Sequence, residues 1–178
     1  MNKQQKDHTG RYSMKNHILI INTGGTFNKI YNPVTGELEV DKTSTALEEI
    51  TQKWLTDFQI INIIGKDSLE MTSHDRLELL ATIHQAEEER IIVIHGTDTM
   101  HVTAEYLADA DLEKEIVLTG AMVPYSIDPV EATANFASAY GFLISKPKEG
   151  VYIAMNGLVS QYDCMIKVRT EGRFTESS

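Results

Sequence analysis

The sequence predicts a single α/β domain whose mostly parallel, doubly wound sheet is covered by helices on both faces, as in Rossmann- and flavodoxin-like folds. Three observations support this prediction. The chain has 178 residues, an ordinary length for one domain with a sizeable core. It contains five short, nearly continuous apolar runs rich in Ile and Val, the pattern of strands buried on both faces. Longer segments with helical spacing separate these runs, as in right-handed βαβ units.

The five apolar runs are the expected strands. They cover residues 18–21, 58–64, 91–94, 116–118 and 151–155. Each run is followed within three residues by Gly. Because Gly tolerates turn conformations, these positions mark where the strands end.

Three segments between the runs have helical character. Thr72 or Ser73 can cap the first, with Asp75 in its first turn. Its residues at helical spacing are Leu77, Leu80, Ala81 and His84. The second segment covers residues 100–110 and places on one side Met100, Thr103, Tyr106, Leu107 and Ala110. The third opens at Asp128-Pro129, a cap followed by a first-turn proline.

Two segments are less regular. Residues 1–16 lack periodicity and are expected to be a mobile leader in front of a domain over residues 17–174. Residues 27–39 contain Asn32-Pro33 and Thr35-Gly36, which predict either a mobile loop or a short hairpin.

The composition excludes several classes of function. The chain carries 26 Asp and Glu against 16 Lys and Arg, a formal net charge of −10. Such a surface repels phosphate backbones, so no nucleic-acid partner is expected. No apolar run reaches the roughly 18–20 residues that cross a bilayer, and the first residues lack an apolar signal-peptide core. The single Cys cannot form an internal disulfide, which fits a reducing cytoplasm. Taken together, these observations predict a soluble cytoplasmic protein without a membrane partner.

Cofactor motifs are missing from the sequence as well. The six His residues form no tight ligand pair, so no metal site is predicted. Neither G-x-G-x-x-G nor G-x-x-x-x-G-K-[ST] occurs, so no nucleotide-phosphate cradle is predicted. We therefore expect a protein that needs no cofactor.

Small polar residues with Gly follow four of the five apolar runs. In an open parallel sheet, ligands bind outside the carboxyl ends of the strands where the strand order reverses, so these residues are expected to converge on one crevice. Thr26, Thr97 and Asp98 are its chemically able members, and Ser68 can join them from the loop after the second strand. The glycines let backbone N–H groups approach a ligand and supply donors for an oxyanion.

A hydroxyl nucleophile at this crevice needs a base, because a free Thr is weak at neutral pH. The sequence offers Asp98 beside Thr97, and Lys167 downstream of the fifth strand. A partly desolvated Lys near a carboxylate can deprotonate a Thr hydroxyl, provided that the pKa of the Lys is lowered. Together these groups suit acyl transfer from an amide or ester.

Each candidate also has a simpler structural interpretation. Thr26 can belong to a tight Gly-rich turn after a strand. Thr97 or Asp98 can cap the next helix, Ser68 can be a turn residue, and Lys167 can be a solvated surface residue. Residue types alone leave both interpretations open.

Two separated motifs resemble the signatures of bacterial-type L-asparaginases. T-G-G-T at residues 23–26 follows the first strand, and H-G-T-D-T-M at residues 95–100 follows a later one. D-S-L-E-M-T at residues 67–72 is similar to the family's serine-containing substrate loop, and T-G-A-M at residues 119–122 to part of its G-A-M-R-P segment. The resemblance covers residues 17–174, nearly the whole chain.

The resemblance implies a role for each matching residue. Thr26 would attack a side-chain amide, and Thr97, Asp98 and Lys167 would form the second catalytic group. Tyr31 lies in the region of the family's lid loop, which carries a catalytic Tyr. The implied substrate-binding residues, in addition to Asp98, are Gly25, Ser68, Leu69, Gly96 and Ala121. Ser68 would bind the α-carboxylate, Asp98 the α-ammonium, and the Ala121 carbonyl would lie beside the amide of L-asparagine or L-glutamine.

The chain departs from the family's pattern in two respects. Family members have a second, smaller C-terminal domain, and this sequence is expected to contain the N-terminal domain only. Val123 stands where the G-A-M-R-P segment has Arg. Three interpretations of function stand side by side: an amide hydrolase that forms a homo-oligomer, a non-catalytic amino-acid-binding module, and a subunit of a larger amidotransferase.

Overall fold

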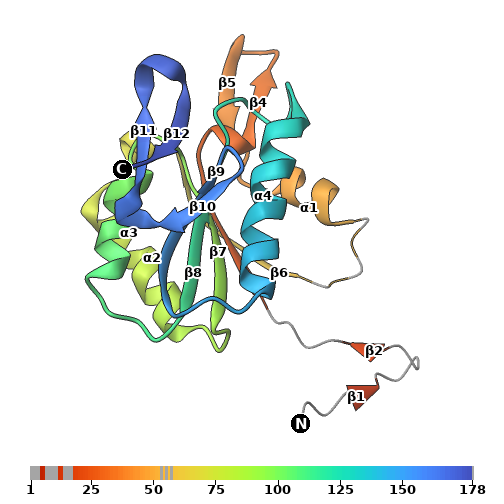
Figure 1. Cartoon of the computed structure of the whole chain (residues 1–178). Helices are drawn as coiled ribbons and strands as arrows, with labels where there is room; N and C mark the ends of the chain where they lie inside the picture. The colour runs from red at the N-terminus through yellow and green to blue at the C-terminus, as the bar shows by residue number, and fades with distance from the viewer. Residues whose placement is uncertain are drawn as a thin grey trace.

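A six-stranded sheet lies at the centre of the molecule (Figure 1). The computed structural model describes residues 18–177 apart from 53, 55 and 57, together with the short strand pair β1 (Gln5–Lys6) and β2 (Tyr12–Ser13). The order of strands across the sheet is β10-β9-β8-β7-β3-β6. Their bounds are β3 (Ile18–Gly24), β6 (Gln59–Lys66), β7 (Arg90–Ile94), β8 (Glu115–Thr119), β9 (Gly150–Met155) and β10 (Leu158–Gln161).

Five of these strands are parallel, and the sheet is doubly wound. β3 pairs in parallel with both β6 and β7, and β8 and β9 continue in the same direction. Numbered in chain order, the parallel strands follow the flavodoxin-like order 2-1-3-4-5 across the sheet. β10 is added antiparallel to β9 at one edge. The predicted fold class is confirmed.

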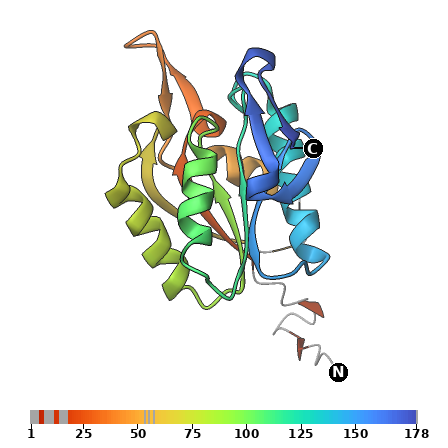
Figure 2. The ribbon, with the colours of Figure 1, turned by 60° about the vertical axis from the view of Figure 1, so that its left-hand side comes forward.

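Helices cover both faces of the sheet (Figures 1 and 2). α1 (Thr45–Thr51) and α4 (Pro129–Ile144) pack on one face, and α2 (Ser73–Gln85) and α3 (Met100–Ala108) on the other. The apolar run of β3 serves both layers, because alternate side chains of a strand point to opposite faces. Ile18 and Ile20 join the core beneath α1 and α4, while Leu19 and Ile21 join the core beneath α2 and α3.

Two helices, α2 and α4, begin at the predicted caps. The Thr72 side chain accepts a hydrogen bond from the backbone N–H of Asp75, whose carboxylate accepts one from the backbone N–H of Thr72. This reciprocal pair is a capping box, which satisfies two free donors at the start of α2. Asp128 caps α4 by accepting from the N–H of Val130.

The buried face of α2 differs from the prediction. The structure buries Asp75, Arg76, Leu79 and Ile83, whereas Leu77, Ala81 and His84 are exposed and Leu80 is half-buried. The helix sequence offers two stripes at helical spacing, and polar contacts select the second one. Lys66 pairs with Asp75, and Arg76 bonds to α3, so α2 is rotated to bring Leu79 and Ile83 onto the sheet. In α3, which ends at Ala108, the predicted Met100, Thr103 and Leu107 are buried.

Residues 27–39 adopt the hairpin alternative of the prediction, formed by β4 (Lys29–Asn32) and β5 (Glu37–Val40). Elements that were not predicted are α1, β10, β11 (Met165–Val168) and β12 (Arg173–Glu176). β9 ends at Met155, so the predicted strand end at Asn156-Gly157 is confirmed. Both residues have positive φ and form the two-residue turn of the β9–β10 hairpin, for which Asn-Gly is the preferred sequence.

Four single-turn 3-10 helices connect the main elements. They are η1 (Thr26–Asn28), η2 (Ser68–Glu70), η3 (Tyr162–Cys164) and η4 (Arg169–Glu171). Within the described part of the chain, no helix is long and apolar enough to span a bilayer. The predicted leader, residues 1–16, lies outside the described residues except for β1 and β2.

Candidate active site

The candidate residues follow strands that meet at the switch point of the sheet. β3 lies between β6 and β7, so the chain leaves β3 in one direction across the sheet and later continues in the other. The carboxyl ends of β3 and β7 are therefore where a crevice is expected. Gly25 and Thr26 follow β3, which ends at Gly24, and residues 95–99 follow β7.

Two glycines allow the segments after the strands to touch. Gly25 has φ +77°, and a Cβ there would lie 2.5 Å from the backbone N and Cα of Gly96. A Cβ on Gly96 would in turn lie 2.6 Å from the Cβ of Ser68, in the loop after β6. No larger residue fits these positions without moving the backbone. Three separate segments thus pack directly on one another.

Lys167 joins this region from β11. Its ammonium group donates to Thr97 Oγ1 at 2.8 Å and to Asp98 Oδ1 at 2.9 Å. Thr97 is buried, and the Lys167 side chain is only 12% exposed. The structure therefore brings together three of the predicted catalytic residues. We call Gly25, Ser68, Gly96, Thr97 and Lys167 the strand-end cluster.

Asp98 has a second cation that residue types alone did not predict. Arg169 Nη1 lies 2.9 Å from the Oδ1 atom that also accepts from Lys167. The alternative interpretation of Asp98 or Thr97 as a helix cap is wrong. The cap position of α3 is Thr99, without a side-chain capping bond, while the Thr97 and Asp98 side chains bond to Lys167.

Ser68 is buried, and its hydroxyl has no hydrogen-bond partner among the described residues. An unpaired buried hydroxyl is costly and needs an explanation, for which a bound polar ligand is one solution. The Ser68 carbonyl is satisfied by Thr99 Oγ1 at 2.8 Å. Leu69, the next residue, has an exposed side chain, and its N–H donates to Asp67 Oδ1.

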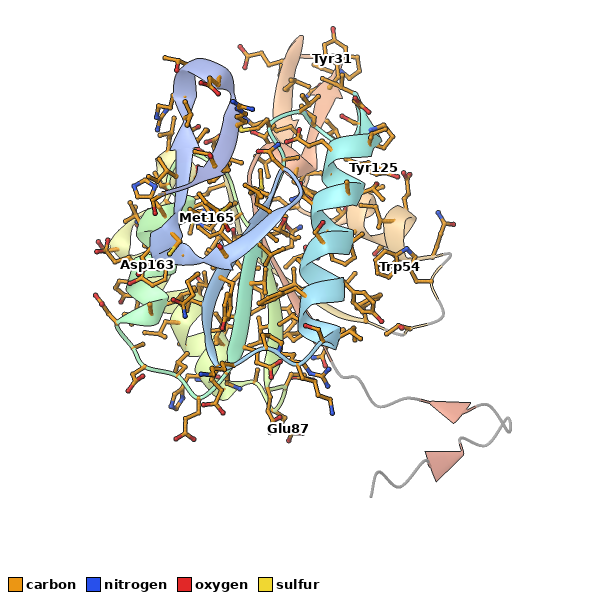
Figure 3. All side chains as sticks on the ribbon, viewed as in Figure 1. Tyr31, Trp54, Glu87, Tyr125, Asp163 and Met165 are labelled. Atoms are coloured by element: carbon orange, nitrogen blue, oxygen red, sulfur yellow. The ribbon has the colours of Figure 1, made fainter. Side chains whose placement is uncertain are left out.

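Thr26 and Tyr31 lie at different depths. Thr26 is half-buried at the first position of η1, directly after Gly25. Tyr31 is 62% exposed on β4, near the outer end of the hairpin (Figure 3). The structure thus places Thr26 beside the strand-end cluster and Tyr31 in solvent. Ala121, in the loop after β8, is fully buried in the core beneath α4.

Two titratable groups beside the cluster have shifted pKa values. Burial lowers the pKa of His95 to about 4, so the ring is neutral at pH 7. Burial raises the pKa of Asp67, but hydrogen bonds from Lys29 and from the Leu69 N–H outweigh it and hold this pKa below its ordinary value. Lys29 Nζ lies 2.6 Å from Asp67 Oδ2 and ties the base of the β4–β5 hairpin to the Ser68 loop.

The arrangement can support acyl transfer. A half-buried hydroxyl at Thr26 stands next to backbone segments held closely by glycines, and an ammonium group bridges a second hydroxyl and a carboxylate. Such groups can position a nucleophile and move protons. Within residues 18–177, as far as they are described, no three His, Cys, Asp or Glu side chains are placed to hold a metal ion.

Comparisons with known proteins agree with the motif resemblance. A family model described as "Asparaginase, N-terminal" matches residues 17–175. The chain is 30% identical to one subunit of the glutamyl-tRNA(Gln) amidotransferase of Methanococcus vannielii, over 93% of this chain and 40% of that protein. It is 30% identical to a probable periplasmic L-asparaginase of Haemophilus influenzae, over 80% of this chain and 44% of that protein.

A solved structure supports the same relationship. The probable cytoplasmic L-asparaginase of Campylobacter jejuni is 25% identical with a TM-score of 0.78, over 91% of this chain and 54% of that one. The chain spans less than half the length of the curated relatives named above. The shared region is the part that the family model describes as N-terminal.

Proposed function

Because the chain belongs to the asparaginase family, we propose that it hydrolyses the side-chain amide of a small amino acid. L-Asparagine is the first candidate substrate, and L-glutamine is the second. The L-asparaginases of Haemophilus influenzae and Campylobacter jejuni named above support this choice. We also propose that residues 17–174 form the catalytic domain and that the reaction needs no cofactor.

One observation carries the proposal: the Lys167 ammonium group bridges Thr97 Oγ1 and Asp98 Oδ1 at the switch point of the sheet. An exposed lysine loses side-chain entropy when it is held in one geometry. Here the lysine is largely buried and aimed at a buried hydroxyl. A proton-handling role explains this placement better than a surface ion pair does.

In the proposed reaction, Thr26 Oγ1 attacks the amide carbon and the C–N bond breaks. The Thr26 hydroxyl proton leaves with the nitrogen as ammonia, and the acyl group stays on Thr26 as an ester. Water then attacks this ester, which releases the carboxylic acid and restores the Thr26 hydroxyl. Once Lys167 has lost a proton to solvent, it can accept one from Thr97, and Asp98 stabilises the ammonium group that forms.

The substrate contacts follow from the unpaired and backbone groups of the site. Ser68 Oγ, which lacks a partner among the described residues, would bind the substrate α-carboxylate. Asp98 would bind the α-ammonium, and the Ala121 carbonyl would lie beside the amide. Gly25, Leu69 and Gly96 would line the same site. Tyr31 would act only after the hairpin brings it towards Thr26.

The first test is ammonia release from millimolar L-asparagine and L-glutamine by the purified chain. We expect turnover in the wild type and none above background in Thr26→Ala, with the circular dichroism spectrum unchanged. Thr82→Ala is the matched control, because its hydroxyl bonds only to the Glu78 carbonyl on the outside of α2. Equal turnover in Thr26→Ala and Thr82→Ala would refute the role of Thr26, and aspartate binding without turnover would favour a binding module.

A second candidate function is the ammonia-producing part of an amidotransferase assembly. The Methanococcus vannielii relative, named as a subunit of such an enzyme, favours it. Size measurement of the purified chain and of the chain isolated from cells distinguishes a homo-oligomer from a complex with a partner subunit. We propose a cytoplasmic location for either form, which the single Cys supports.

A further inference from the structure

We propose that Arg76 is a positioning residue that fixes the Ser68 loop against the segment of residues 95–99. This inference rests on the proposed function, in which both segments hold the substrate. Arg76 lies in the first turns of α2, outside every motif of the sequence, and it is only 9% exposed. Its importance follows from what its guanidinium group reaches.

The guanidinium group makes three hydrogen bonds to other segments. Nε donates to Thr103 Oγ1 at 3.0 Å, Nη1 to the Met71 carbonyl at 3.2 Å, and Nη2 to Thr99 Oγ1 at 3.3 Å. Met71 ends the Ser68 loop, while Thr99 and Thr103 lie at the start of α3. Arg76 therefore binds the loop after β6 and the helix after β7 at the same time. Hydrogen bonds from a charged donor are stronger than neutral ones.

The N–H donors of Arg76 also decide which hydrogen bonds Thr99 and Thr103 can donate. Because an arginine only donates, both threonine hydroxyls accept from it and are left to donate their own protons. Thr99 donates to the Ser68 carbonyl at 2.8 Å. Thr99 occupies the cap position of α3 without capping it, so its hydroxyl serves this contact between segments instead.

Two chains of hydrogen bonds thus start at Arg76. The first runs through Thr99 to the Ser68 carbonyl, and the second runs through Thr103 and His95 to Gly96. Thr103 Oγ1 lies 2.8 Å from His95 Nε2, and His95 Nδ1 lies 2.7 Å from the Gly96 carbonyl. Since Thr103 donates, Nε2 accepts and the ring proton resides on Nδ1, from which it is donated to the Gly96 carbonyl. The neutral state of the buried ring fits this direction.

Both chains of hydrogen bonds end at the contact between Ser68 and Gly96. Ser68 is held through its carbonyl, Gly96 is held through its carbonyl, and the two residues pack directly on each other. The unpaired Ser68 hydroxyl owes its position to this contact. Loss of Arg76 would free the two segments to separate, which would weaken substrate binding more than it would slow the proposed chemical step at Thr26.

The test compares Arg76→Gln, Arg76→Lys and the control Glu78→Gln, which changes one charge on the exposed side of α2. In Arg76→Gln we expect KM for L-asparagine to rise at least tenfold while kcat stays within about threefold, the pattern of lost binding. Arg76→Lys keeps the positive charge but not the planar guanidinium group. Its KM should therefore lie between that of the wild type and that of Arg76→Gln. Glu78→Gln should match the wild type. An unchanged KM in folded Arg76→Gln would overturn the proposal.

A second readout does not depend on activity. The nuclear Overhauser effect between the Ser68 Hβ and Gly96 Hα protons should be present in the wild type and Glu78→Gln, and lost in Arg76→Gln. Retention of this contact in Arg76→Gln would overturn the proposal even if the wild type released no ammonia. Lack of ammonia release from the wild type would refute the proposed function instead, and the Overhauser contact alone would then decide the role of Arg76.

Thr99→Val keeps the inference testable if Arg76→Gln does not fold. This variant removes only the hydroxyl that links Arg76 to the Ser68 carbonyl. We expect it to raise KM in the same direction, with kcat little changed. If both variants fold, the double variant should raise KM no further than Arg76→Gln alone, because the two residues act in one chain of contacts. An additive effect would show that they act separately and would overturn the proposal.

Discussion

The strand-end cluster and the β4–β5 hairpin carry residues of the same proposed site but are built in opposite ways. In the cluster, glycine backbones and buried side chains from several strands are in direct contact. In the hairpin, the large apolar side chains are mostly in solvent, with Val34 91% exposed. Its polar side chains mainly bond to one another, as Asn32 and Thr35 do to Glu39.

The hairpin is attached to the rest of the molecule at its base. Lys29 pairs with Asp67, and the Lys29 carbonyl accepts from Ser126 Oγ at 2.7 Å. Segments with little buried apolar surface open locally at low cost, whereas a packed sheet does not. The difference teaches that the cluster residues are held in a fixed geometry by the sheet, whereas Tyr31 lies on an exposed hairpin with few contacts to the rest of the molecule.

The largest expected effect compares two glycines with similar positive φ, Gly25 at +77° and Gly36 at +74°. In Gly25→Ala the new Cβ meets the Gly96 backbone, so we expect the free energy of unfolding to fall by about 3 kcal/mol or more and ammonia release to be lost. In Gly36→Ala nothing lies within 4 Å of the new Cβ, so only the backbone cost of about 1–2 kcal/mol remains. Urea unfolding measures the loss of free energy of unfolding in each variant. Equal losses would contradict the contrast between cluster and hairpin.

The next effect compares one proposed catalytic group from each region. Lys167→Met removes the ammonium group that bridges Thr97 and Asp98, and we expect kcat to fall about 10²–10⁴-fold. Tyr31→Phe removes an exposed hydroxyl, so the free energy of unfolding should change by less than about 0.5 kcal/mol. If Tyr31 arrives with the substrate, kcat should nevertheless fall about tenfold. An unchanged kcat in Tyr31→Phe would refute a role of the hairpin in the proposed reaction.

The smallest expected effect is a pH dependence of stability that originates beside the cluster. The pKa of His95 is lowered from 6.5 to about 4. The contribution of the neutral ring to the free energy of unfolding is therefore full above pH 6.5 and declines as the pH falls towards 4. Between pH 7 and pH 5 the loss amounts to about 2 kcal/mol. In the hairpin, hydrogen bonds from Asn32 and Thr35 lower the pKa of Glu39, so any effect there lies at more acidic pH.

Urea unfolding at pH 7, 6 and 5 measures this dependence. His101→Gln is the control, because His101 is exposed on α3 and should leave the slope unchanged. A free energy of unfolding that stays constant between pH 6.5 and 5 would contradict the burial of a neutral His95.

Most of the sheet could be predicted from the sequence, because its parallel strands are continuous apolar runs. The turn at Asn156-Gly157 also has a sequence signal, but the strand that follows it, β10, is short and only half-buried. The face of α2 could not be predicted from periodicity. Its orientation depends on Lys66 and α3, which are remote in the sequence, and these contacts bury Arg76.

The candidate site shows the same division. Thr26, Thr97 and Ser68 could be placed near one another, because the ends of parallel strands meet at one edge. Lys167 was a candidate base by its residue type, but only the resemblance to a family distinguished it from a solvated surface lysine. Arg169 and Arg76 were missed altogether, since charged residues without a motif are normally solvated.

The contacts of Lys167 have a consequence for the order in which the molecule forms. They join positions 70 and 69 residues apart, and the bond from Thr23 Oγ1 to the Ile94 carbonyl joins positions 71 residues apart. Closing such long loops delays contacts relative to local helices and hairpins. During refolding, the far-ultraviolet signal of helices should therefore return before the proposed amide hydrolysis, whose recovery would report the completed native topology.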